Sequence, residues 1–95
     1  MAGYDVGREA RLAGEHLRGW RMVLGLTAEQ VAERAGITRD TLRKLETGNP
    51  KVGFDVVLRV ARALGVADVL TGALDPLQTD LGRARADLLH RKRAR

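Results

Sequence analysis

The sequence predicts an all-α protein with one domain and a short C-terminal extension. Aromatic residues make up only 3% of the chain, which disfavours an all-β sandwich, and apolar residues recur at helical spacing. The chain has 95 residues, enough for one domain and too few for two. We expect the domain over residues 8–74 and the extension, with its basic tail, over residues 75–95.

The first predicted helix covers residues 8–24, where apolar residues recur at helical spacing and Gly25 follows as a stop. We expect Trp20, which lies on this stripe, to belong to the core. Gly14 and Gly19 argue against this helix, because each glycine costs about 1 kcal/mol of helix stability relative to alanine in a helix interior.

The second and third predicted helices both begin at a threonine cap. The hydroxyl of Thr27 can accept from the backbone of Gln30 while the Gln30 side chain reaches back, which is a capping box. This helix ends at Gly36, the residue best able to adopt the left-handed conformation. The next helix begins at Thr38 and runs to about Thr47.

The rest of the chain predicts two more helices in the domain and one in the extension. A fourth helix follows Gly53 and ends at Gly65, and a short fifth helix covers about residues 68–73. Pro76 then breaks the chain. A sparse apolar stripe predicts a last helix over about residues 80–91.

Only three residues, 35–37, separate the second and third helices, which is the layout of a helix-turn-helix. A helical corner without a DNA role is the alternative. If Leu42 and Leu45 point inward, the third helix presents a charged face to bases. Arginine can bond guanine O6 and N7 together, and aspartate can accept from cytosine N4, although stabilisation of the helix dipole explains the aspartate equally well. The expected base-contacting residues are Arg39, Asp40, Arg43 and Lys44.

Residues 21–48 read RMVLGLTAEQVAERAGITRDTLRKLETG, and residues 57–66 read VLRVARALGV. Both segments resemble the XRE/Cro-type helix-turn-helix family. The resemblance implies a lambda-repressor-like domain of five helices that binds double-stranded DNA. It also implies a structural ion pair between Arg21 and Glu46, and an arginine on the inner half of the first helix would otherwise be buried unpaired.

The resemblance further implies contacts to DNA phosphates around the two helix starts and in the loop after the third helix. The family often has glutamine where this chain has Ala28, so the backbone N–H groups there and the Thr27 side chain become the nearest substitutes. The expected phosphate-contacting residues are Thr27, Ala28, Thr38, Asn49 and Lys51.

Residues 74–83 and the basic end resemble the HipB-like branch, whose members are commonly paired with a HipA-like kinase toxin. The resulting hypothesis is an antitoxin that represses its own genes. A stand-alone phage- or plasmid-type repressor is one alternative, and a protein-interaction module that neutralises a partner with little specific DNA binding is another. An RNA-binding module is disfavoured, because aromatic platforms for base stacking are missing.

We expect a homodimer, because one recognition helix reads only a few base pairs. The expected interface follows the fourth helix and contains Val66, Val69, Leu70 and Leu74. The net charge is +5, and four cations of the tail supply most of it. The tail is either a solvated end or a contact to phosphate or an acidic partner. Its cations are Arg91, Lys92, Arg93 and Arg95.

The composition argues against an enzyme. The chain contains no cysteine and no serine, so disulfides, thiolate metal sites and Ser or Cys nucleophiles are excluded. His16 and His90 lack the spacing of a metal site. No glycine-rich nucleotide motif is present. We expect no cofactor, no signal peptide, no membrane span and a cytoplasmic location.

Overall fold

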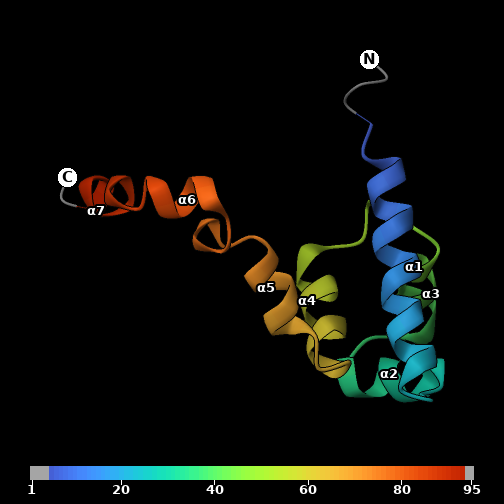
Figure 1. Ribbon diagram of the computed structural model, residues 1–95. Coiled ribbons are helices and arrows are strands. Elements are labelled where there is room, and N and C mark those ends of the chain that lie inside the picture. Colours follow the sequence, from blue (N-terminus) through green and yellow to red (C-terminus); the bar gives the residue numbers. More distant parts are fainter. Residues whose placement is uncertain (1–4, 94–95) are drawn as a thin grey trace.

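The computed structural model describes residues 5–93 and is all-helical over that range, which confirms the predicted fold class. Side chains of the basic tail, from Arg91 onward, lie outside the described part. Figure 1 shows a bundle of helices from which the C-terminal segment projects. The elements are α1 (Gly7–Val23), α2 (Ala28–Ala35), α3 (Arg39–Glu46), α4 (Phe54–Ala63), α5 (Ala67–Ala73), the 3-10 turn η2 (Pro76–Gln78), α6 (Asp80–Ala84) and α7 (Asp87–Arg93).

Helices α2, α3 and α4 enclose an aliphatic core. Their inward positions follow the helical period, so a few small and medium side chains close the space between them. Helix α1 covers α3, and Leu17 packs against the core from that side. The fully or nearly fully buried residues are Val31, Ala32, Ala35, Leu42, Leu45, Val60, Ala61, Leu64 and Val66.

The predicted caps are present and fix the turn between α2 and α3. Gln30 N donates to Thr27 Oγ1 (3.1 Å) and Thr27 N donates to Gln30 Oε1 (2.9 Å), which completes the capping box. Gly36 has φ of 70°, a left-handed conformation that ends α2. Thr41 N donates to Thr38 Oγ1 (3.1 Å) at the start of α3. Local sequence therefore determines where α3 begins.

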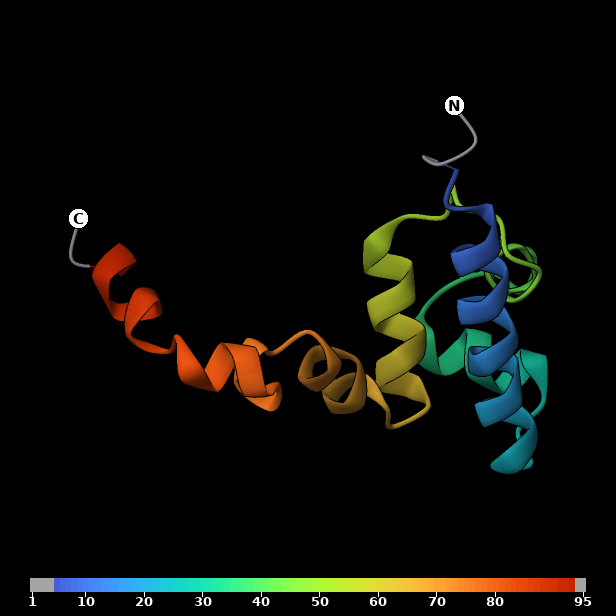
Figure 2. The same ribbon diagram turned by 45° about the horizontal axis from the view of Figure 1, so that its top comes forward.

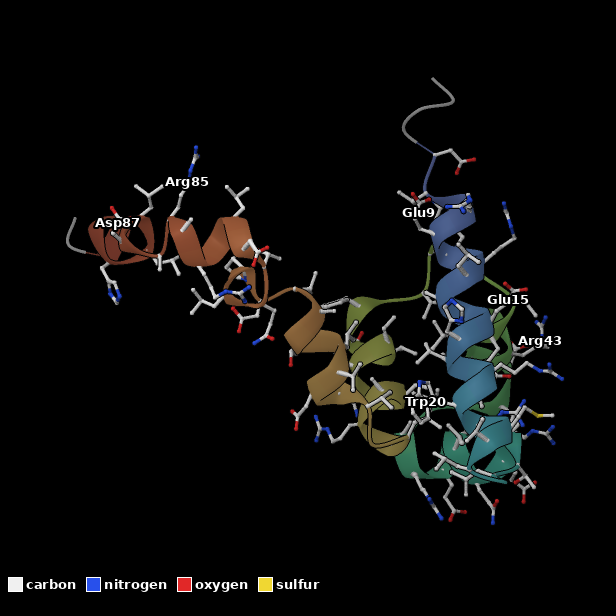
Figure 3. The ribbon with its side chains drawn as sticks, viewed as in Figure 1. Glu9, Glu15, Trp20, Arg43, Arg85 and Asp87 are labelled. Carbon is white, nitrogen blue, oxygen red and sulfur yellow. The ribbon has the colours of Figure 1, made fainter. Side chains whose placement is uncertain are left out.

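Trp20 does not belong to the core, so that prediction is wrong. Its side chain is 43% exposed on the surface of α1 (Figure 3). The face of α1 that meets α3 is formed instead by Gly14, Leu17 and Arg21. Gly14 is buried, and a Cβ there would lie 2.8 Å from the carbonyl oxygen of Glu46. Trp20 lies outside this contact face, so its indole remains at the surface of α1.

The C-terminal segment leaves α5 and runs away from the bundle, as Figures 1 and 2 show. We call residues 75–93 the arm. The single helix predicted over residues 80–91 is instead two helices, because the backbone departs from helical geometry at Arg85 (φ −119°, ψ 27°). None of residues 75–90 is buried, so no tertiary packing maintains a continuous helix there.

Within residues 5–93, none of the helices combines the length and the hydropathy that crossing a bilayer requires.

Candidate nucleic-acid interface

Helix α3 has one buried face and one charged face. Leu42 and Leu45 are buried against α2 and α4, which fixes the rotation of the helix about its axis. The opposite face therefore points to solvent, and Figure 3 places Arg43 on the side of the bundle away from the arm. The structure brings the four predicted base-contacting side chains together on this face and leaves all of them exposed; they are Arg39, Asp40, Arg43 and Lys44.

Asp40 organises the cations beside it. Its Oδ1 accepts from Arg43 Nη2 (2.8 Å) and Nε (3.3 Å), and its Oδ2 lies 3.4 Å from Lys44 Nζ. The hydrogen bond from Arg43, followed by that from Lys44, lowers the pKa of the Asp40 carboxyl below its usual value. Asp40 therefore holds two cations of this face, Arg43 and Lys44, beside its carboxylate.

Arg21 and Glu46 join the ends of α1 and α3. Arg21 Nε donates to Glu46 Oε2 (2.8 Å) and Nη2 donates to Oε1 (2.9 Å), a bidentate geometry. Arg21 Nη1 also donates to the carbonyl of Leu26 (3.3 Å), in the loop before α2. Hydrogen bonding to Glu46 raises the pKa of Arg21. The two residues are placed as the resemblance implied, and they hold the three helices in a fixed relation.

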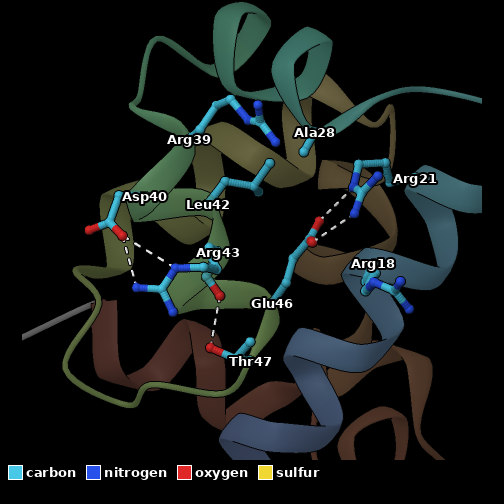
Figure 4. A pocket seen from close by; sticks show the side chains of 9 residues that line it. All are labelled: Arg18, Arg21, Ala28, Arg39, Asp40, Leu42, Arg43, Glu46 and Thr47. Atoms are coloured by element: carbon cyan, nitrogen blue, oxygen red, sulfur yellow. Dashed lines mark hydrogen bonds and ion pairs between the residues drawn. The ribbon is translucent and has the colours of Figure 1, made fainter.

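A cleft of about 500 Å³ separates α1 and the start of α2 from α3 (Figure 4). Arg39 extends from the start of α3 toward Ala28, across the opening of this cleft. Arg18 also lines it, and sequence reasoning missed this residue. The signal that could have revealed Arg18 is its spacing of three residues from Arg21, which puts both on one face of α1. Opposed arginines on α1 and α3 make the cleft entrance attractive to anions.

The predicted phosphate-contacting residues lie in three places. Thr27 and Ala28 are at the start of α2, and Ala28 lines the cleft. Thr38 caps α3 with its hydroxyl oxygen. Asn49 and Lys51 are exposed in the loop after α3, where Lys51 N donates to Asn49 Oδ1 (2.8 Å). All five lie next to α3 or to the cleft.

The predicted dimer surface needs one correction. Val66 is only 7% exposed and belongs to the core, because its backbone bonds to α4 and turns its side chain inward. Val69 (64% exposed) and Leu74 (73% exposed) point to solvent, and Leu70 is half-buried. The exposed apolar surface at the end of the domain therefore consists of Val69 on α5 and Leu74 directly after it, with Leu70 at its edge.

A family model described as a helix-turn-helix domain matches residues 12–74, more than half of the chain. The chain belongs to this helix-turn-helix domain family. The matched region contains α3, the cleft and the Arg21–Glu46 pair. The arm follows the matched region.

Several curated relatives of this helix-turn-helix protein carry regulator names. An uncharacterized HTH-type transcriptional regulator of Methanothermobacter thermautotrophicus is 47% identical over 49 residues, which are 52% of this chain and 71% of the relative. A propionyl-CoA carboxylase regulator of Cereibacter sphaeroides is 36% identical over 77 residues, which are 79% of this chain and 17% of the relative. An uncharacterized HTH-type transcriptional regulator of Mycobacterium tuberculosis is 36% identical over 70% of this chain and 50% of its own length. No solved structure matches the chain.

Proposed function

We propose that this helix-turn-helix protein is a transcriptional regulator that binds double-stranded DNA sequence-specifically as a homodimer. The observation that carries the proposal is the charged face of α3, which packing of Leu42 and Leu45 fixes on the surface. Arg39, Arg43 and Lys44 offer donors to the guanine edge, whose O6 and N7 accept bidentate bonds. The names of the regulator relatives point the same way.

The surrounding residues would fix the position of α3 in the groove. Arg18 and Lys51 lie on different elements, α1 and the loop after α3, and both are exposed. Contacts from such positions to phosphate provide affinity and register, whereas contacts to base edges provide specificity. We therefore assign Arg39 and Arg43 to base reading, and we assign Arg18 and Lys51 to the backbone.

Dimerisation would double the number of base pairs that the protein contacts. Two copies of α3 spaced by about one helical turn, roughly 34 Å, would read two half-sites on one side of the duplex. Val69 on α5 and Leu74 directly after it are exposed, and α5 packs on α4. We assign the contact between protomers to this part of the chain.

Selection of duplexes from a random library, followed by fluorescence anisotropy, tests the proposal. The wild-type protein is expected to enrich one sequence and to prefer it over a scrambled duplex. Arg39→Ala is expected to lose that preference, whereas Arg62→Ala, which removes an exposed arginine of α4, is expected to keep it. Enrichment of no sequence, or equal effects of the two substitutions on the preference, would contradict the proposed reading.

An antitoxin role with a HipA-like kinase is a second candidate. The feature that favours it is the resemblance of residues 74–83 to the HipB-like branch. Co-expression with a HipA-like kinase from the same genome tests it: stable co-purification and loss of kinase activity support the role. A kinase that remains active and elutes separately would contradict the antitoxin role, and the interpretation as a stand-alone repressor would remain.

A further inference from the structure

A small hollow between α2 and α4 brings three arginine side chains together. Its volume is about 260 Å³, and it is lined by Arg34, Arg59, Arg62, Ala35 and Ala63. Arg34 belongs to the last turn of α2, whereas Arg59 and Arg62 belong to α4. Ala35 is buried and Ala63 is half-buried, and these short side chains leave room that larger ones would fill. The surface is therefore concave where the three arginines meet.

The positive charge of the hollow is only partly compensated. Within residues 5–93, no carboxylate is among the side chains that line it. Asp55 does not line the hollow, although its Oδ2 lies 3.6 Å from Arg59 Nε in an exposed pair, a kind of contact that contributes little energy. Arg34 and Arg62 form no ion pair with any other residue in that range. The hollow therefore has an excess of positive charge.

Stabilisation of helix ends explains only two of these arginines. Arg34 and Arg62 lie in the last turns of their helices, where a cation interacts favourably with the helix dipole. Arg59 lies before that turn of α4. Arg59 and Arg62 are also three residues apart on one face of the helix, where like charges repel each other. Their arrangement costs electrostatic free energy that a bound anion would offset.

The hollow adjoins the turn between α2 and α3. A Cβ at Gly36 would lie 3.7 Å from Arg59 Nη1, so this guanidinium reaches from α4 to the left-handed glycine that ends α2. Of the residues that the structure describes, none lines both this hollow and the cleft beside α3. The cleft also contains the carboxylates of Asp40 and Glu46. The hollow is thus a second cationic site, separate from the candidate nucleic-acid interface.

We propose that Arg34, Arg59 and Arg62 bind the diphosphate group of a small molecule. A guanidinium offers a planar pair of donors that matches two oxygens of a phosphate. One carboxylate has two oxygens and a single charge, too few to engage three guanidiniums, whereas a diphosphate has more of both. The volume is below the range of about 300–1,000 Å³ that is usual for pockets that enclose a whole ligand, so the rest of the molecule would lie outside the hollow. This inference goes beyond the proposed function and does not depend on it.

Titration with inorganic pyrophosphate at constant ionic strength, followed by amide NMR, tests the proposal. The largest shifts are expected at the amides of Ala35, Gly36 and Ala63. Largest shifts at Arg18 and Arg39 would place the anion in the cleft and would overturn the proposal. Succinate, which carries two carboxylates, is expected to bind about tenfold more weakly than pyrophosphate. Equal binding of the two would show general attraction of anions and would contradict a phosphate site.

Arg59→Ala and Arg83→Ala form a matched pair of variants for this titration. The two arginine side chains are 53% and 56% exposed, and each pairs with an aspartate of its own helix. Arg59→Ala is expected to weaken pyrophosphate binding about tenfold, because charged hydrogen bonds are lost, whereas Arg83→Ala should not change it. Equal effects of the two substitutions would overturn the proposal.

DNA is another source of phosphate, and Arg34→Ala distinguishes it from a small molecule. This variant is expected to weaken pyrophosphate binding and to leave the salt dependence of DNA binding unchanged. A salt slope reduced by about one unit would show that Arg34 contacts the DNA backbone, which would contradict a small-molecule site. Wild-type protein that binds pyrophosphate in the hollow yet prefers no DNA sequence would contradict the proposed function alone.

Discussion

Arg21 and Glu46 are bound to each other by two parallel hydrogen bonds of 2.8 and 2.9 Å, and they come from the last turn of α1 and the last residue of α3. Their side chains are only 13% and 9% exposed. Both residues line the cleft between these helices, together with Arg18 and Arg39 (Figure 4). The pair therefore links α1 to α3 from a largely buried position.

Removing the carboxylate should mainly affect stability. Glu46→Ala leaves Arg21 without its partner in a largely buried position, which costs about 3 kcal/mol, the lower end of the range for broken buried pairs, because some water reaches the site. Thermal unfolding followed by circular dichroism measures the loss. Glu33→Ala, which removes an exposed carboxylate of α2, is the control and should change the melting temperature little. An unchanged melting temperature in Glu46→Ala with loss of DNA binding would mean that Glu46 acts in the DNA complex.

Two glycines of α1 should respond oppositely to the same substitution. At Gly14 a Cβ meets the backbone carbonyls of Leu45 and Glu46, so Gly14→Ala forces α1 and α3 apart and should destabilise the protein by about 1 to 3 kcal/mol. At Gly19 a Cβ meets nothing within 4 Å, so Gly19→Ala should stabilise it by up to about 1 kcal/mol through helix propensity. Urea unfolding of the two variants measures both effects. Similar shifts of the same sign would contradict the close contact between α1 and α3.

The Asp40 carboxyl should titrate below the usual aspartate value of 3.8, because Arg43 and, to a smaller extent, Lys44 bond its charged form. Arg43→Ala should return the pKa toward 3.8 more than Lys44→Ala does. A carboxyl whose pKa is lower in the folded state than in the unfolded state stabilises the protein at pH values above its unfolded-state pKa. This stabilisation is lost as the pH falls through the folded-state pKa. Carboxyl-carbon NMR measures the titration. An Asp40 pKa at or above 3.8 would show that the bonds to Arg43 and Lys44 do not persist in solution.

Arg39 and Lys51 should affect DNA binding in different ways. Arg39→Ala should cost about 1 to 3 kcal/mol on the selected duplex and little on a scrambled one, because a bidentate base contact is lost. Lys51→Ala should weaken both duplexes alike and reduce the salt slope by about one unit, because a phosphate contact is lost. Anisotropy titrations at several salt concentrations separate the two effects. Equal losses of affinity for both duplexes in Arg39→Ala would show that α3 contacts only phosphates.

The parts of the fold that sequence predicts well are those that local chemistry determines. The Thr27–Gln30 capping box and the left-handed Gly36 require only nearby residues, and both are present. The charged face of α3 follows from the spacing of Leu42 and Leu45. The relation between Arg21 and Glu46 came from a family resemblance, since a contact across 25 residues leaves no local signal.

The predictions that failed depend on packing between distant elements. Trp20 lies on an apolar stripe, but α1 contacts the rest of the bundle through Gly14, Leu17 and Arg21, which leaves the indole exposed. Val66 lies just after a glycine stop, and its burial depends on how α5 leaves α4. The break at Arg85 arises where nothing packs on the arm, and neither glycine nor proline marks it.

Replacement of guanine by 7-deazaguanine in the selected duplex tests the central claim, that α3 reads bases in the major groove, most directly. The substitution removes the N7 acceptor from the major groove and leaves the phosphates and the minor groove unchanged. At guanines contacted by Arg39 or Arg43, we expect affinity to fall at least fivefold for the wild-type protein and to change little for the corresponding alanine variant. Wild-type affinity that is unchanged by replacement of every guanine would contradict the account.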